Sequence, residues 1–218
     1  MRNLVIAMGL AVAVAFAAPA LADDKDKKVD YGKTKCVCPS NNAQTVVWCE
    51  PCAGGVAFGH SIKSKELVTA LAGHQMKEEG IKCGGCKTAF KDNSDCKHCK
   101  VGFRHGLKFH SAVSLTLAKG KLIDAEKIDC PRCKTIAEKG TGECSGCKTG
   151  VVAGLMFHGK DNYRNARTAN TTLAKAITAS DKCLGCAVAM VSDGTCEGCK
   201  TSFKDGKKVT EASPTMGG

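Results

Sequence analysis

The sixteen cysteines of this chain are the residues whose type and spacing could do chemistry. They form four sets that recur roughly every fifty residues, as a fourfold internal repeat. The sets are Cys36, Cys38, Cys49 and Cys52; Cys83, Cys86, Cys96 and Cys99; Cys130, Cys133, Cys144 and Cys147; and Cys183, Cys186, Cys196 and Cys199. In the last three sets, nine or ten residues separate two Cys-x-x-Cys pairs. A hairpin of that length would bring four sulfur atoms together, as in a tetrahedral thiolate metal site. We therefore predict that all sixteen cysteines are metal ligands.

The last three sets resemble the short zinc-ribbon family, whose pattern is two Cys-x-x-Cys knuckles separated by about ten residues. The stretches that carry the resemblance are CGGCKTAFKDNSDCKHC, CPRCKTIAEKGTGECSGC and CLGCAVAMVSDGTCEGC. The resemblance implies zinc as the bound ion, and iron is also chemically compatible with four thiolates. The first set departs from the pattern, because a single residue separates Cys36 from Cys38.

One cysteine pair resembles a redox motif. Trp48-Cys49-Glu50-Pro51-Cys52 is similar to the Trp-Cys-Gly-Pro-Cys motif of the thioredoxin family, which opens a long helix. Here the motif is followed by AGGVAFGHS, whose three glycines disfavour a helix. The pair also occupies the third and fourth positions of the repeat. We therefore predict a protein that is not an enzyme, with thiol–disulfide exchange through Cys49 and Cys52 as the weakest alternative.

Other cysteine chemistries compete with metal binding. Covalent haem is excluded, because no histidine directly follows a Cys-x-x-Cys pair. A secreted chain rich in cysteine is commonly a disulfide framework, so a disulfide-stapled structural protein is one alternative. Another alternative is a metal-handling protein with exchangeable ions. Seven copies of the Cys-x-x-Cys spacing favour metal, and neighbouring lysines would offset thiolate charge.

The N-terminal sequence predicts export. Arg2, an apolar run and Ala20-Leu21-Ala22 are typical of a secretory signal peptide over residues 1–22, which indicates a periplasmic or secreted protein. Residues 23–35 are polar, and we expect them to be disordered. Four cysteine modules follow: module 1 at 36–80, which is atypical, module 2 at 81–128, module 3 at 129–180 and module 4 at 181–208. Residues 209–218 are expected to be a disordered tail.

Composition restricts the partners. The formal net charge is +11, but aromatic residues make up only 5% of the chain, and thiolate sites would add negative charge. Nucleic acid is therefore disfavoured as a partner. No later segment is apolar enough to span a membrane. The sequence does not name a protein partner.

These observations predict a fold of small α+β modules. We expect tandem zinc-ribbon-like β-hairpin knuckles joined by short helices and stabilised by metal or disulfides, each with a small core of its own. A helix is predicted after Ser64, from the stripe Leu67, Ala70, Leu71 and His74. TANTTLAKAITAS predicts a second helix, whereas SAVSLTLAKGKL fits a helix or a strand. His60, His110 and His158 could ligate a second metal, but we favour a role in flanking helices.

Overall fold

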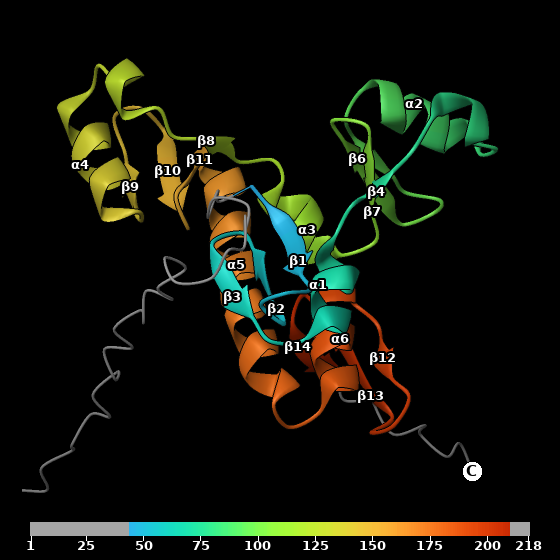
Figure 1. Ribbon diagram of the computed structural model, residues 1–218. Helices are drawn as coiled ribbons and strands as arrows, with labels where there is room; N and C mark the ends of the chain where they lie inside the picture. Colours follow the sequence, from blue (N-terminus) through green and yellow to red (C-terminus); the bar gives the residue numbers. More distant parts are fainter. Residues whose placement is uncertain (1–43, 210–218) are drawn as a thin grey trace, which may run out of the picture. The chain divides into compact units, whose positions relative to one another are not determined.

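The computed structural model describes residues 44–209 as a mixed α/β structure of small antiparallel sheets and helices (Figure 1). The predicted signal peptide, the N-terminal segment, Cys36, Cys38 and the tail beyond Val209 lie outside the described residues. Within 44–209 the strands form four sheets, with the orders β1-β2-β3, β4-β7-β6-β5, β8-β11-β10-β9 and β12-β13-β14.

Each module contains a β-hairpin with the same tight turn. Both central turn residues have positive φ in every hairpin, which is typical of a type I′ turn. The turns are Phe58-Gly59, His105-Gly106, Ala153-Gly154 and Asp205-Gly206. The hairpins are β2 (Gly54–Ala57) with β3 (His60–Ile62), β6 (Val101–Arg104) with β7 (Leu107–Phe109), β10 (Thr149–Val152) with β11 (Leu155–His158), and β13 (Thr201–Lys204) with β14 (Lys207–Val209). The sequence repeat is therefore also a repeat of backbone conformation.

A further strand precedes each hairpin and carries the third cysteine of its set. These strands are β1 (Val46–Cys49), β5 (Asp95–Cys96), β9 (Gly142–Cys144) and β12 (Thr195–Cys196). Two sheets gain a fourth strand from the preceding linker, because β4 (His74–Gln75) pairs with β7 and β8 (Lys121–Leu122) pairs with β11. Single 3-10 turns, η2 (Glu78–Gly80) and η3 (Ala125–Lys127), then lead to the next cysteine pair.

The predicted hairpin between the two cysteine pairs is wrong, because this segment is helical. It forms α2 (Gly84–Lys91), α4 (Pro131–Lys139) and α6 (Leu184–Ser192). Each of these helices ends at or just before a residue with positive φ. Asn93, Gly140 and Asp193 have φ of 47°, 69° and 51°, the left-handed conformation common just after a helix.

Three other helices follow the hairpins. The helix predicted after Ser64 is confirmed as α1 (Lys65–Leu71), where the Ser64 side chain accepts a hydrogen bond from the Leu67 N–H. His74, which was assigned to this helix, lies in β4. The ambiguous segment forms the helix α3 (Ala112–Leu117), and the last predicted helix is the end of the longer α5 (Lys160–Ser180).

The hydrophobic core is largely shared between modules, against the expectation of one small core each. We call the main cluster the shared core, and it consists of Ala57, Phe58, Ile62, Leu67, Val68, Leu71, Val113, Leu117, Val152, Leu155, Phe157, Tyr163, Ala166, Ala169, Leu173, Ala176, Ala187 and Val191. Two smaller clusters lie around cysteines, one built on Phe103 in module 2 and one on Phe203 in module 4. Helices pack between modules because single modules are too small to bury them alone.

Candidate metal centres

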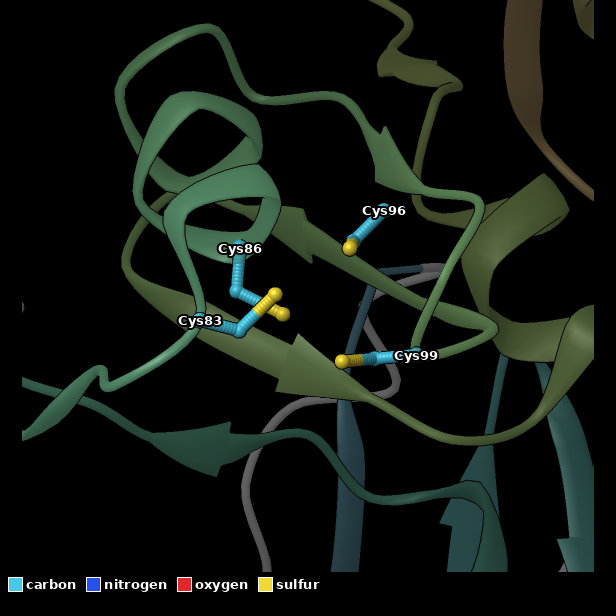
Figure 2. A group of neighbouring side chains, drawn as sticks. All are labelled: Cys83, Cys86, Cys96 and Cys99. Atoms are coloured by element: carbon cyan, nitrogen blue, oxygen red, sulfur yellow. The ribbon is translucent and has the colours of Figure 1, made fainter.

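In modules 2 to 4, each set of cysteines is built from one helix start and one hairpin. The first cysteine of the set is the N-cap residue of α2, α4 or α6, and the second lies in the first turn of the same helix. The third ends a short strand, and the fourth lies in the turn before the hairpin. Figure 2 shows this arrangement in module 2, where Cys83 and Cys86 face Cys96 and Cys99.

The four sulfur atoms of each set lie close together. The sets are Cys83, Cys86, Cys96 and Cys99; Cys130, Cys133, Cys144 and Cys147; and Cys183, Cys186, Cys196 and Cys199, and within each set all four sulfur atoms lie within 4.8 Å of one another. Within three modules, therefore, the structure brings together the cysteines that the sequence predicted as a group. Each set could hold one metal ion.

Three sulfur–sulfur distances are close to those around a tetrahedral ion. The Sγ atom of Cys183 lies 3.8 Å from the Sγ atom of Cys196 and 3.5 Å from that of Cys199. In module 3, the Sγ atoms of Cys130 and Cys144 are 4.0 Å apart. Tetrahedral zinc with Zn–S bonds of about 2.3 Å requires sulfurs about 3.8 Å apart. A disulfide bond is much shorter, at about 2.05 Å. The sulfurs therefore have the spacing of ligands around a common ion.

The backbone prepares one thiolate in each set. The N–H of Cys86 donates to the Cys83 sulfur. This hydrogen bond is the largest of the causes that lower the pKa of Cys83 to about 6. The N–H groups of Cys133 and Cys186 lower the pKa of Cys130 and Cys183 to about 7 in the same way. A first thiolate can therefore form at neutral pH without a metal.

The second and fourth thiols of each set resist ionisation while no cation is present, because their pKa values are raised. The neighbouring Cys183 sulfur is the largest cause that raises the pKa of Cys186 to about 12. Cys133 and the other sulfurs of its set likewise raise the pKa of Cys147 to about 12. Four thiolates cannot share so small a space unless a cation balances them, and a divalent ion would reverse these shifts.

Each set opens to solvent at its fourth cysteine. Cys99, Cys147 and Cys199 are exposed, whereas the third cysteine of each set is buried. The residue after the fourth cysteine has positive φ in all four modules, namely Ala53, Lys100, Lys148 and Lys200. This turn is therefore a repeated backbone feature, and in three of its four copies a lysine directly follows the exposed cysteine.

Module 1 preserves this turn, but only half of its cysteines are described. Cys49 ends β1 and Cys52 lies in the turn before β2, as in the other modules. Their predicted partners Cys36 and Cys38 lie outside the described residues. The segment after Cys52 forms the strand β2, so the pair does not open a helix as the thioredoxin-like motif does.

Two of the three histidines take the flanking positions that we favoured, whereas His60 lies in β3. His110 and His158 immediately precede the N-cap residues of α3 and α5. His60 hydrogen-bonds the Asn170 side chain at 2.8 Å, and the rings of His74 and His110 lie edge to face with centroids 6.1 Å apart. Among residues 44–209, no group of three or more metal-ligating side chains includes a histidine.

Sequence reasoning missed the glycines that make room for the sulfurs. A Cβ on Gly85 would lie 3.1 Å from the Cys96 sulfur, and a Cβ on Gly185 would lie 2.8 Å from the Cys196 sulfur. Each glycine directly precedes the second cysteine of its set. A glycine at this position of the Cys-x-x-Cys pair was therefore the sequence feature that could have indicated the close packing. Module 3 has Arg132 at this position, and its guanidinium lies 3.5 Å from the Ser145 hydroxyl on the opposite knuckle.

Comparison with protein-family models, curated proteins and solved structures finds no match for this chain. No helix of the described segment combines the length and the apolar character needed to cross a membrane.

Proposed function

We propose that this protein is a metal-binding repeat protein whose four-cysteine sites hold its modules in shape. The observation that carries the proposal is the convergence of four sulfurs, all within 4.8 Å of one another, at three separate places. The local clusters beside these sites are small, so a bound ion would supply much of the stability of each cysteine unit.

We propose zinc as the ion, with iron as the competing metal. Zinc and iron both accept four thiolates in tetrahedral geometry, so geometry does not separate them. The short separation between the knuckles supports zinc, because it fits the zinc-ribbon resemblance better than a rubredoxin-type site. Each filled site would carry a net charge of about −2, which the surrounding lysines would offset.

The proposal extends to a fourth site and to a location. Cys49 and Cys52 lie on the same knuckle backbone as the other modules, which supports a site completed by Cys36 and Cys38. The predicted signal peptide supports a periplasmic or secreted protein. In this setting the modules would act as a non-enzymatic scaffold or binding module for a protein partner.

Metal analysis of the purified mature protein tests the proposal directly. Elemental analysis should find zinc at three ions per chain, or four if module 1 is also filled, and thiol titration under denaturing conditions should recover the cysteines as free thiols. Full pairing of the cysteines in disulfides without bound metal would overturn the proposal. Iron in place of zinc would correct the metal and leave the four-thiolate sites standing.

A second candidate function is metal handling, and the exposed fourth cysteines favour it. An incoming ligand could approach the bound ion from the solvent side and displace the exposed sulfur of Cys99, Cys147 or Cys199. Chelator titration separates the two functions. A structural site should unfold its module when it is stripped, whereas a handling site should release its ion while circular dichroism stays unchanged.

A further inference from the structure

The outer face of α5 carries a row of basic side chains. Arg164, Arg167 and Lys175 are exposed, and their spacing of three and eight residues places them on one face of the helix. At a rise of 1.5 Å per residue, the row extends along about 16 Å of the helix. The Arg167 guanidinium lies over the Tyr163 ring, with its central carbon 5.7 Å from the ring centroid, which restrains that side chain.

The turn of the last hairpin forms the opposite wall of a groove along this face. Gly206 lies against Thr172 so closely that a Cβ on the glycine would overlap the threonine side chain. The Asp205 N–H donates to the Asp193 carboxylate at 2.8 Å, which ties the turn to the end of α6. This packing places Lys207 opposite the α5 row, and the groove between the two walls has a volume of about 390 Å³.

The basic side chains of this groove are not neutralised by neighbouring acids. Arg164, Arg167, Lys175 and Lys207 form no ion pair with any residue in the described range 44–209. Asp205 is the one acid among the described residues that line the groove, which leaves an excess of three positive charges. By contrast, Arg104 and Lys119 elsewhere on the surface are both paired with Asp95.

We propose that this groove binds a linear anionic chain that carries phosphate or sulfate groups and no bases. Arginine and lysine side chains in a row suit successive oxyanions, and arginine can bind such a group with two parallel hydrogen bonds. The hydroxyl of Thr171 adds a donor along the same wall. Among residues 44–209, no aromatic side chain lines the groove, so this part of the chain offers no stacking surface of the kind that single-stranded nucleic acid uses.

Binding of labelled inorganic polyphosphate and of heparin to the purified, metal-loaded protein tests this proposal. The first variant replaces Arg164, Arg167 and Lys175 with glutamine. The control variant makes the same change at Lys63, Lys77 and Lys139, which are exposed, form no ion pair with the described residues and do not line the groove. Both variants lose three positive charges, so general electrostatic attraction falls equally. Metal content and circular dichroism of both variants verify that the fold is intact.

We expect wild-type protein to bind one or both probes, and the groove variant to bind at least about tenfold more weakly at physiological salt. The slope of log affinity against log salt concentration should be smaller in magnitude by about 2 for the groove variant, because three contacts to the anion are lost. The control variant should stay within about twofold of wild type. The stronger probe distinguishes a phosphate chain from a sulfated glycan.

Three results would overturn the proposal. These are absence of binding by the wild-type protein, equal loss in the groove and control variants, and tighter binding of single-stranded DNA of matched length than of either probe. The first two results would assign the positive charge to an ordinary solvated surface. Because metal content is measured separately, a failure here would leave the proposed metal sites untouched.

Discussion

Removing one cysteine should have unequal effects in modules 4 and 2, because α6 belongs to the shared core and α2 does not. The helix α6 contacts α1, α3 and α5, and the hydroxyl of Ser111, the N-cap residue of α3, donates to the Val191 carbonyl at 2.7 Å. The helix α2 instead contacts β5 and β6 of its own module. Cys186→Ser and Cys86→Ser change the same position of the two sets, so they form a matched pair.

The expected difference follows from the side chains that α6 buries. Val191 and Ala187 are fully buried in the shared core, and three further apolar residues of α6 are partly buried against it. At about 1.5–3 kcal/mol for a fully buried aliphatic side chain, release of α6 costs about 5 kcal/mol. That is comparable with the total stability of many domains, about 5–15 kcal/mol. In a chain of this size, a loss of about 5 kcal/mol lowers the midpoint of thermal unfolding by about 10–20 °C.

The fluorescence of Trp48 is a suitable assay, because Trp48 is the one tryptophan of the chain and packs against the shared core. Thermal unfolding followed by this signal should shift strongly downward in Cys186→Ser and stay close to wild type in Cys86→Ser. Both variants should lose about one metal ion by elemental analysis. Equal shifts of the Trp48 midpoint in the two variants would refute the reasoning, because the cysteine set of module 2 would then support the shared core as much as that of module 4.

Three further predictions concern the sites and their supports. Gly185→Ala should weaken metal binding by the cysteines of module 4 in a competitive chelator titration, because its Cβ would lie 2.8 Å from the Cys196 sulfur. Gly198→Ala is the control and should not weaken binding, because a Cβ there meets nothing within 4 Å. Ser111→Ala should lower the free energy of unfolding by about 2–4 kcal/mol in urea, since a helix cap and a buried hydrogen bond to α6 are both lost. Metal affinity should fall as the pH is lowered and rise as the pH is raised through 7 to 9, because protons compete with the metal for thiols whose pKa is raised. Calorimetry in two buffers should show that protons are released when the metal binds.

Each of these expectations has its own contradicting result. Equal metal affinity in Gly185→Ala and Gly198→Ala would show that the sulfur cluster has room for a side chain. Ser64→Ala loses a cap and an exposed hydrogen bond to the Glu66 carboxylate, with an expected cost of about 1 kcal/mol. An equal cost for Ser111→Ala would therefore mean that the buried bond to α6 contributes nothing. Metal affinity that does not change with pH would mean that the thiols are not the ligands.

The grouping of the cysteines in modules 2 to 4 was predictable from the sequence, because it depends on short-range geometry. Two cysteine pairs that are nine or ten residues apart can meet through local structure of almost any kind. The connecting structure itself was predicted wrongly. A residue such as Asn93 or Asp193 with positive φ serves a hairpin turn and a helix end equally well, so local composition does not distinguish the two.

Only the tertiary structure decided how the modules are joined. The shared core combines residues from all four modules, and the basic groove combines α5 with a hairpin turn about thirty residues further along the chain. The sequence by itself determined the repeat and the grouping of the cysteines in modules 2 to 4, because both depend on residues that are close in the sequence. The unequal roles of α2 and α6 depend on which apolar faces meet across long sequence separations, and periodicity within one segment does not encode that choice.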